Sequence, residues 1–150
     1  MKVKYFDLKN KRVFVSGGGS GIGATIVEHF CEQQSEVYFI DINIKASKQL
    51  IEKIKKKRFR VPKFIECNVL EIQKLQNLIK DIISKKGPIH CLINSAANDD
   101  RHSTEQVDEK YWENRMGINL KHYFFAAQSV VKGMKKIKSG SIVNLSSVSW

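Results

Sequence analysis

Long hydrophobic runs, paired cysteines and an acidic charge balance are all missing from this 150-residue chain. No uninterrupted apolar run approaches the roughly 18 residues of a transmembrane helix. The first residues, MKVKYFDLKNKR, contain no apolar segment of the kind found in a signal peptide. The three cysteines, Cys31, Cys67 and Cys91, are odd in number and far apart, which suits buried thiols in a reducing compartment. We therefore expect a cytoplasmic protein with no disulfide framework and no metal site.

Acidic residues are scarce relative to basic ones, since 15 Asp and Glu stand against 26 Lys and Arg and give a net charge of +11. Such an excess can indicate nucleic acid or an anionic membrane surface as a partner. The strongest basic run, EKIKKKRFR at 52–60, ends an amphipathic helical pattern, where cations also complement the helix dipole. The run therefore favours a solvated helix face. We expect neither nucleic acid nor a membrane as partner, and nucleic-acid binding stays the alternative that the charge raises.

Short apolar runs alternate with amphipathic stretches along the chain. The runs that we expect to form buried strands are RVFVS (12–16), EVYFID (36–41), KFIEC (63–67), CLIN (91–94) and SIVNLS (141–146). Helical spacing covers about 22–34, a Lys-rich stretch after the second strand, 71–86, and a long region from an N-cap at Asp108 to Met134 with a break near Gly117. This alternation predicts one α/β domain over residues 1–150, a doubly wound parallel sheet of the Rossmann type. Ligands of such sheets bind beyond the carboxyl ends of the strands.

The glycine-rich stretch SGGGSGIG, residues 16–23, lies between the first expected strand and the first expected helix. A tight turn there needs residues without a Cβ, because the backbone has to approach a pyrophosphate closely. Free amides at the helix N-terminus then meet the phosphates. This context favours dinucleotide binding over a glycine turn without a ligand. The cofactor contacts that we expect here are Gly17, Gly19, Ser20, Gly21, Ile22 and Gly23.

Asp41 ends the second expected strand, 24 residues after Gly17 (41 − 17). A carboxylate at that position can accept both ribose hydroxyls of NAD, and it repels the 2′-phosphate of NADP. The following residues, INIK, offer Lys45 but no adjacent arginine to hold a 2′-phosphate. NAD is therefore the expected cofactor. The alternative role for Asp41 is to cap a loop or a helix.

The spacing of Gly17, Gly21 and Gly23 resembles the Gly-x-x-x-Gly-x-Gly turn of the short-chain dehydrogenase/reductase family. Later stretches resemble the same family in the same order, over the whole chain. CNVL is similar to the Asp-Val step that holds the adenine, which implies contacts from Asn68 and Val69. Asn68 departs from the family aspartate, but its amide oxygen still accepts a hydrogen bond.

Three further stretches extend the resemblance. NSAA, residues 94–97, is similar to the family's Asn-Asn-Ala-Gly and implies cofactor contacts from Asn94 and Ala96. Ser95 and Ala97 replace Asn and Gly there. INL places Asn119 on the family's helix asparagine, and GSIVNLSS places the catalytic serine on Ser147. The resemblance implies that Ser147 binds the reacting oxygen and that Asn119 orders a water in a proton relay.

A narrower resemblance concerns the substrate. ANDDRH (97–102), YWENRMGINLKHYFFAAQ (111–128) and the final SVSW are similar to members that oxidise aldoses, such as xylose, arabinose or fucose, at C1. The residues Asp99, Asp100, Arg101 and His102 follow the fourth expected strand, so they lie at the mouth of the crevice, and Trp150 joins them by resemblance. Carboxylates and a forked guanidinium suit a polyhydroxylated small molecule. The alternative is a solvated charged loop or a subunit contact.

The family's acid/base pair, Tyr-x-x-x-Lys, lies past the catalytic serine and so would fall beyond Trp150. The only match in this chain, YFDLK at 5–9, precedes the first strand and is interpreted as a chance match. We therefore expect a truncated chain that lacks the last strands of the family fold and is inactive alone, from a homo-oligomeric enzyme of roughly 250 residues. Two alternatives stay open: a non-catalytic nucleotide-binding half-domain, and a 3-oxoacyl-thioester reductase of the same family.

Overall fold

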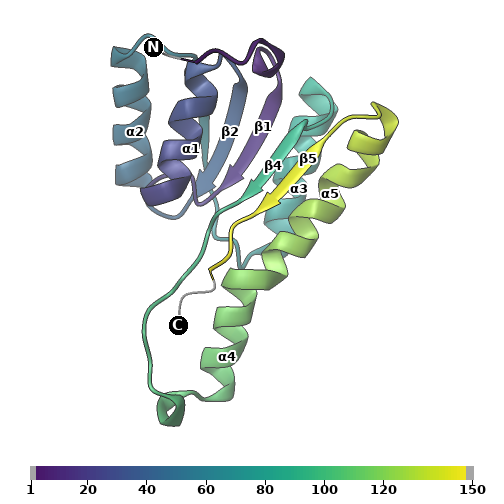
Figure 1. Cartoon of the computed structure of the whole chain (residues 1–150). Coiled ribbons are helices and arrows are strands. Elements are labelled where there is room, and N and C mark those ends of the chain that lie inside the picture. The colour runs from purple at the N-terminus through teal and green to yellow at the C-terminus, as the bar shows by residue number, and fades with distance from the viewer. Residues whose placement is uncertain (1–2, 148–150) are drawn as a thin grey trace.

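A five-stranded parallel sheet forms the centre of the molecule in the computed structural model, which describes residues 3–147 (Figure 1). The strands are β1 (Arg12–Ser16), β2 (Glu36–Asp41), β3 (Lys63–Glu66), β4 (Cys91–Asn94) and β5 (Ser141–Asn144). Their order across the sheet is β3-β2-β1-β4-β5, and every neighbouring pair is parallel. The prediction of a doubly wound parallel sheet is confirmed.

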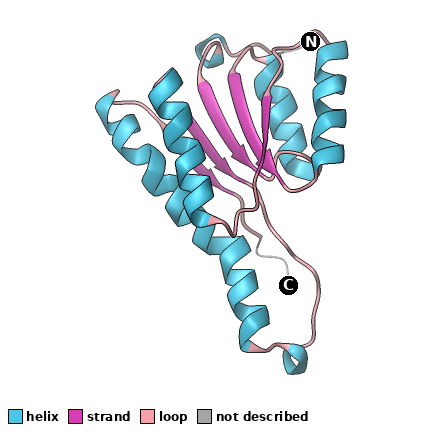
Figure 2. Ribbon diagram, turned by 180° about the vertical axis from the view of Figure 1, so that it is seen from behind, coloured by secondary structure: helices cyan, strands magenta, loops and turns pink. Residues whose placement is uncertain are grey.

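Helices cover both faces of the sheet, as the views from opposite sides show (Figures 1 and 2). The α-helices are α1 (Gly21–Glu32), α2 (Ile44–Lys56), α3 (Ile72–Lys86), α4 (Glu109–Met116) and α5 (His122–Lys136). Two short 3-10 turns, η1 (Phe6–Leu8) and η2 (Thr104–Gln106), and a π-helical segment, η3 (Gly117–Lys121), complete the described elements. Parallel strands that follow each other in the chain need a crossover connection, which is usually a helix.

The core consists of two apolar layers, one on each face, because side chains alternate along a strand. In β1, Val13 and Val15 pack in the layer that contains Val27 of α1 and Ile54 of α2. Phe14, between them, packs in the opposite layer with residues of α3 and α5. Fully buried strands of this kind are continuous apolar runs, which is why RVFVS was recognisable in the sequence.

The long helical region expected from Asp108 onward is continuous in the chain but changes geometry at Gly117. Asp108 caps α4, since its Oδ1 accepts a hydrogen bond from the amide of Tyr111 at 2.6 Å. A Cβ on Gly117 would lie 2.6 Å from Cδ2 of Leu70, so glycine permits the close approach. The predicted break near Gly117 is a π-helical turn rather than a chain reversal. Consequently α4 and the loop before it extend beyond the carboxyl ends of the strands (Figure 1).

β5 is an edge of the sheet among the described residues and pairs only with β4. Ile142 and Val143 on this strand are 38% and 41% exposed. The N-terminal segment lies at the opposite end of the strands from the glycine turn, where the amide of Tyr5 donates to Oε1 of Gln33, just past the end of α1. No helix within residues 3–147 is both long and apolar enough to cross a bilayer.

Candidate functional site

The glycine-rich turn connects β1 to α1 and is closed by backbone contacts. The amides of Gly17 and Gly18 both donate to the carbonyl of Ile40 on β2, at 2.9 and 3.1 Å. Gly17 has φ +70°, and a Cβ on it would lie 2.6 Å from Cα of Ala96. A Cβ on Gly23 would lie 2.0 Å from the carbonyl oxygen of Gly17. The turn therefore needs glycine for steric reasons at its first and last positions.

The first turn of α1 lacks the side-chain cap that α2 and α4 possess. Ser20 is the N-cap residue of α1, but its side chain makes no capping hydrogen bond. In α2, by contrast, Oδ1 of Asn43 accepts from the amide of Ala46 at 3.0 Å. Apart from its chain neighbours and its own helix backbone, nothing lies within 4 Å of the position that a Cβ on Gly21 would take, and Ile22 is 70% exposed. The start of α1 thus presents amides and open space, which fits the phosphates of a dinucleotide.

Asp41 lies directly beside this turn. Its Oδ2 accepts a hydrogen bond from the amide of Gly19 at 2.8 Å, and its Oδ1 accepts from the amide of Asn43 at 2.8 Å. Because Asn43 caps α2, Asp41 is not a helix cap, but its hydrogen bonds from the amides of Gly19 and Asn43 make it a loop cap, which is the other form of the alternative role. Ser47 Oγ, buried and without a hydrogen-bond partner in the described chain, lies 2.5 Å from where a Cβ on Gly19 would be. The residues present therefore fit a ribose held between the turn and a fixed carboxylate.

Asn68 and Val69 follow β3 at the same edge of the sheet. The amide of Cys67 donates to the carbonyl of Asp41 at 3.3 Å, which places this segment next to the end of β2. Asn68 Oδ1 accepts from the amide of Leu70 at 3.0 Å, so the amide oxygen shapes its own turn. Val69 is buried in the apolar layer on the α3 side.

The segment after β4 brings the two halves of the site together. Asn94 is fully buried, and its Nδ2 donates to Asn144 Oδ1 at 2.8 Å and to the carbonyl of Tyr123 at 3.4 Å. Its side chain thus joins β4 to β5 and to α5, away from solvent. Ala96 packs against Gly17, as the close approach of that glycine shows. Tyr123 also donates its hydroxyl to the carbonyl of Leu145 at 3.0 Å, and burial raises the pKa of this phenol.

One buried hydroxyl contacts both the β4 segment and α5. Ser16 Oγ accepts from the amides of Ser95 and Ala96 at 3.2 and 3.3 Å, and it lies 3.1 Å from Nε2 of His122. Burial lowers the pKa of His122 to about 4, although the backbone carbonyls of Ile118 and Gly117 oppose this. The imidazole is therefore neutral at neutral pH.

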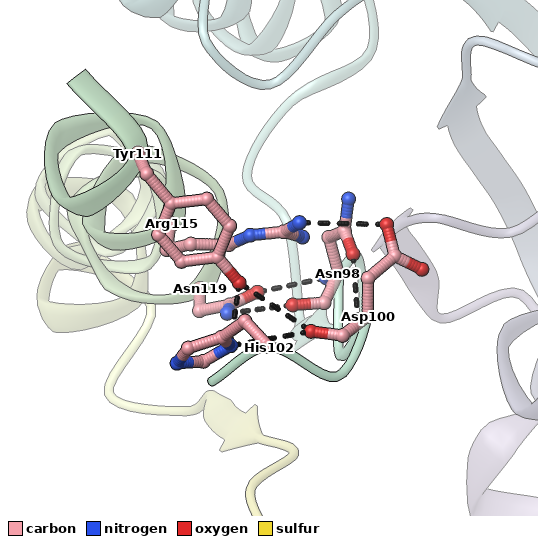
Figure 3. A network of polar contacts seen from close by, with 6 residues as sticks. All are labelled: Asn98, Asp100, His102, Tyr111, Arg115 and Asn119. Atoms are coloured by element: carbon pink, nitrogen blue, oxygen red, sulfur yellow. Dashed lines mark hydrogen bonds and ion pairs between the residues drawn. The ribbon is translucent and has the colours of Figure 1, made fainter. Parts of the chain in front are cut away.

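Asn119 lies on the π-helical segment and binds the loop after β4 through both ends of its side chain (Figure 3). Its Oδ1 accepts from the amide of Asn98 at 2.8 Å, and its Nδ2 donates to the carbonyl of Asn98 at 2.9 Å. Asn98 in turn accepts from the amide of Asp100 through its own Oδ1 at 3.0 Å. The side chain of Asn119 is thus occupied in fixing the loop, which the sequence had not indicated.

Two further contacts hold the same loop on α4 (Figure 3). The hydroxyl of Tyr111 lies 2.7 Å from Nδ1 of His102, and Arg115 Nη2 forms an ion pair with Asp100 Oδ2 at 3.4 Å. The guanidinium of Arg115 also stacks over the Tyr111 ring, 4.6 Å from its centroid. Within residues 3–147, neither Asp99 nor Arg101 forms a hydrogen bond or ion pair, and both are exposed. Asn98, Asp100 and His102 therefore anchor the loop, and Asp99 and Arg101 take no part in these contacts.

The expected catalytic serine, Ser147, is exposed and lies three residues past the end of β5 (147 − 144). This places it beyond the carboxyl end of the sheet, at the same edge as Asn119 and the glycine turn. Trp150, the remaining residue expected to contact substrate, lies outside the described residues. The structure therefore places the other expected site residues at or just past the carboxyl ends of the strands, but the side chains of Asn94 and Val69 are buried and do not face an open site.

Sequence reasoning missed the residues that connect these parts: Ser16, Asn98, Tyr111, Arg115, His122 and Tyr123. One signal was available for His122, because a polar residue on the apolar face of an amphipathic helix needs a buried partner. No periodicity could have paired it with Ser16, which lies 106 residues earlier.

Comparison with known proteins is consistent with this geometry. The family model described as short chain dehydrogenase matches residues 11–149. A probable galactose dehydrogenase of Rhizobium meliloti (strain 1021) is 38% identical over 144 residues, which cover 96% of this chain and 56% of the relative. A D-xylose 1-dehydrogenase of Caulobacter vibrioides (strain NA1000 / CB15N) is 38% identical over 146 residues, covering 97% and 57%. The chain thus spans little more than half the length of the curated relatives it matches.

A solved structure supports the same fold. The citronellol catabolism dehydrogenase of Pseudomonas aeruginosa PAO1 superposes with a TM-score of 0.84 at 24% identity, over 95% of this chain and 58% of that one. At this identity the likeness concerns the fold alone.

Proposed function

Since the chain belongs to the short-chain dehydrogenase family, we propose that the full-length protein is an oxidoreductase that moves a hydride between C1 of an aldose and NAD. The observation that carries the proposal is the glycine turn, with an uncapped helix start on one side and the carboxylate of Asp41 on the other. The relatives named as galactose and xylose dehydrogenases support a sugar as the small-molecule substrate.

The proposed cofactor site uses the backbone more than side chains. The amides at the start of α1, beginning at Gly21, would bind the pyrophosphate, and Asp41 would accept the hydroxyls of the adenosine ribose. Each Asp41 oxygen has one backbone donor and retains a lone pair for a hydroxyl. The same carboxylate would repel a 2′-phosphate, which is the reason for proposing NAD rather than NADP.

The chemistry that NAD supplies when bound is to accept the hydride that leaves the sugar carbon. Ser147 would donate a hydrogen bond to the reacting oxygen, and Asn119 would keep the loop at 98–102 in place beside it. A serine hydroxyl does not accept a proton at neutral pH, so the substrate O–H proton needs a stronger base. We propose that this base is a tyrosine assisted by a lysine, located in the full-length protein beyond position 150. Loss of hydride and proton together converts the cyclic sugar to a lactone.

Substrate binding is assigned to the loop after β4. Asp99 and Arg101 are exposed and form no hydrogen bond or ion pair with the rest of the described chain, so they are available for sugar hydroxyls. His102 is fixed by Tyr111, which leaves its second ring nitrogen, Nε2, to complete the pocket. By the resemblance, Trp150 would supply an apolar contact to the sugar.

A homo-oligomer in the cytoplasm is the proposed state of the full-length protein. Trp112, Leu120 and Phe124 form an exposed apolar stripe along the helical region α4–η3–α5, at 58%, 54% and 65% exposure. A stripe of this kind indicates a protein contact. Buried cysteines suit a reducing compartment, and burial raises the pKa of the Cys31 thiol to about 12, so it resists oxidation.

The test is a substrate screen with the protein encoded by the complete reading frame. We expect NAD reduction with a pentose, a hexose or a 6-deoxyhexose, and little turnover with aliphatic alcohols. Activity confined to 3-oxoacyl thioesters with NADPH would contradict the sugar assignment and favour the reductase alternative. A chain of residues 1–150 assayed in parallel should show no turnover, and turnover there would direct attention back to Tyr5 and Lys9.

A further inference from the structure

Within the described chain, the buried hydroxyl of Ser16 has one neighbouring group that can accept a hydrogen bond from it, the imidazole of His122. Ser16 is the last residue of β1, directly before the glycine turn, and it is fully buried. Its oxygen already accepts two hydrogen bonds, from the amides of Ser95 and Ala96. A hydroxyl has two lone pairs and one proton, so the proton is left to donate. Nε2 of His122 lies 3.1 Å from Ser16 Oγ and can accept this proton when the ring proton is on Nδ1.

This donation fixes the protonation state of His122. If Nε2 accepts, the ring proton must lie on Nδ1, and the imidazole must be neutral. The ring is fully buried and packs edge-on against Tyr123, with centroids 4.5 Å apart. Nδ1 forms no hydrogen bond of good geometry among residues 3–147, although the backbone carbonyls of Gly117 and Ile118 act on the ring, so Ser16 is the side-chain anchor of His122 in the described structure.

His122 is also the first residue after the π-helical segment that carries Asn119. The path therefore runs from the glycine turn through the polar contact between Ser16 and His122, and then along the helix backbone from His122 to Asn119. From there Asn119 continues to the backbone of Asn98 in the loop after β4. The path connects the turn proposed for the cofactor with the loop proposed for the substrate. Its Ser16–His122 contact joins two residues that are 106 positions apart in the sequence.

We propose that His122 is a positioning residue that holds the glycine turn and the Asn119 segment in fixed relation by accepting the hydroxyl proton of Ser16. It touches neither cofactor nor substrate. Without this acceptor, the Ser16 hydroxyl proton would be buried without a partner. If the hydroxyl rotates to find another acceptor, the hydrogen bonds that its oxygen accepts from the amides of Ser95 and Ala96 weaken. The part of the inference that concerns cofactor affinity depends on the dinucleotide site proposed above.

Two substitutions at one position separate positioning from simple packing. His122→Phe keeps a flat ring of similar size but removes the acceptor. His122→Gln can place an amide oxygen near the position of Nε2 and so restores it. In the full-length protein, we expect His122→Phe to weaken NAD binding about tenfold, as loss of one buried hydrogen bond implies, and His122→Gln to stay within about twofold of the wild type.

Three measurements give the readout: calorimetric titration with NAD, amide hydrogen exchange, and the 15N spectrum of the His122 ring. Exchange should accelerate at Ser95, Ala96 and Asn98 in the Phe variant and return toward normal in the Gln variant. Ser129→Ala, which removes another hydroxyl hydrogen bond on α5, is the control and should leave these amides unchanged. The wild-type spectrum should show a protonated Nδ1 and an unprotonated Nε2.

Two results would overturn the proposal. One is a His122→Phe protein with lower thermal stability but unchanged exchange at Ser95 and Ala96 and unchanged NAD affinity. The other is a ring protonated at Nε2. Wild-type protein that binds no dinucleotide would refute the proposed function, whereas the exchange and ring signals would still decide the role of His122.

Discussion

The two ends of the candidate site are built from different kinds of contact. Around the glycine turn, backbone amides meet backbone carbonyls, and fully buried apolar side chains such as Val27 and Phe39 pack beneath them. Around the loop at 98–102, exposed and half-buried polar side chains hold the backbone, and α4 contributes no buried residue. Apolar burial stabilises a fold far more than exposed polar pairs do. The proposed cofactor end is thus a fixed part of the fold, and the proposed substrate end is held to it by weaker surface contacts.

The difference predicts that the glycine-turn end governs stability and that the loop end governs substrate specificity. A region held by buried contacts opens only at a cost close to that of global unfolding, whereas a region held by surface hydrogen bonds opens locally. Changes at the cofactor end should therefore damage folding and binding together. Changes at the substrate end should alter substrate affinity and leave the fold intact.

The largest effect is expected from Gly23→Ala. Its Cβ would lie 2.0 Å from the carbonyl oxygen of Gly17, and neither backbone can move without opening the turn. We expect a loss of about 3 kcal/mol or more in the free energy of unfolding, with NAD binding undetectable by calorimetry. Gly21→Ala is the control, because its Cβ meets open space and only the φ of +54° is strained, at about 1 kcal/mol. Equal losses in the two variants would show that strain, not close approach, dominates.

The next largest effect is expected from acid, which should weaken the contact between Ser16 and His122 that joins the two ends of the site. The folded pKa of His122 lies near 4, below the unfolded value of about 6.5, so the neutral ring stabilises the fold above pH 6.5 and this contribution disappears as the pH falls toward 4. The expected loss is about 3 kcal/mol in the free energy of unfolding. Denaturant titrations at pH 7, 5.5 and 4.5 measure it.

The control is His122→Gln, in which this part of the pH dependence should vanish. His90 will contribute a remainder, because burial also lowers its pKa. An unchanged pH dependence in the Gln variant would assign the whole effect to His90 and the carboxyl groups.

Asp41→Ala should have an intermediate effect that is confined to cofactor choice and affinity. Removal of the carboxylate eliminates both the ribose acceptor and the repulsion of a 2′-phosphate, so the preference for NAD over NADP should shrink about tenfold in kcat/KM. Glu66→Ala is the matched control, because Glu66 pairs in register with Asp41 at the end of β3. A comparable change in cofactor preference in Glu66→Ala would show that the summed negative charge at this edge of the sheet, rather than Asp41 itself, sets the preference.

Tyr111→Phe should have the smallest effect on stability and would sharpen the comparison most. The variant loses the 2.7 Å contact with His102, which is exposed, so the free energy of unfolding should change by less than about 1 kcal/mol. The KM for sugar should nevertheless rise severalfold, because the loop is no longer fixed. Tyr5→Phe, at the far end of the strands, serves as control. A destabilised protein with normal sugar KM would contradict the assignment of this loop to the substrate.

The same contrast explains what the sequence allowed us to predict. Strands such as Arg12–Ser16 and Cys91–Asn94 have the predicted bounds because apolar runs report burial directly. The cap at Asp108 and the change of helix geometry at Gly117 followed from local chemistry. The loop contacts did not, because pairs such as Asp100–Arg115 depend on how the chain returns on itself. Polar pairs on the surface produce no periodic pattern in a sequence, so they cannot be predicted from it.

The central place of β1 in the sheet has a consequence for the order of folding. Val13 pairs with Val37 on one side, 24 residues away, and with Cys91 on the other, 78 residues away. Closing the longer loop costs about 1 kcal/mol more in chain entropy, and on a ribosome its second strand also emerges later. The β1–α1–β2 unit should therefore assemble first, with its glycine turn still lacking Ala96 as a neighbour. A nascent chain released before β4 is made would contain the complete glycine motif and still have no finished nucleotide pocket.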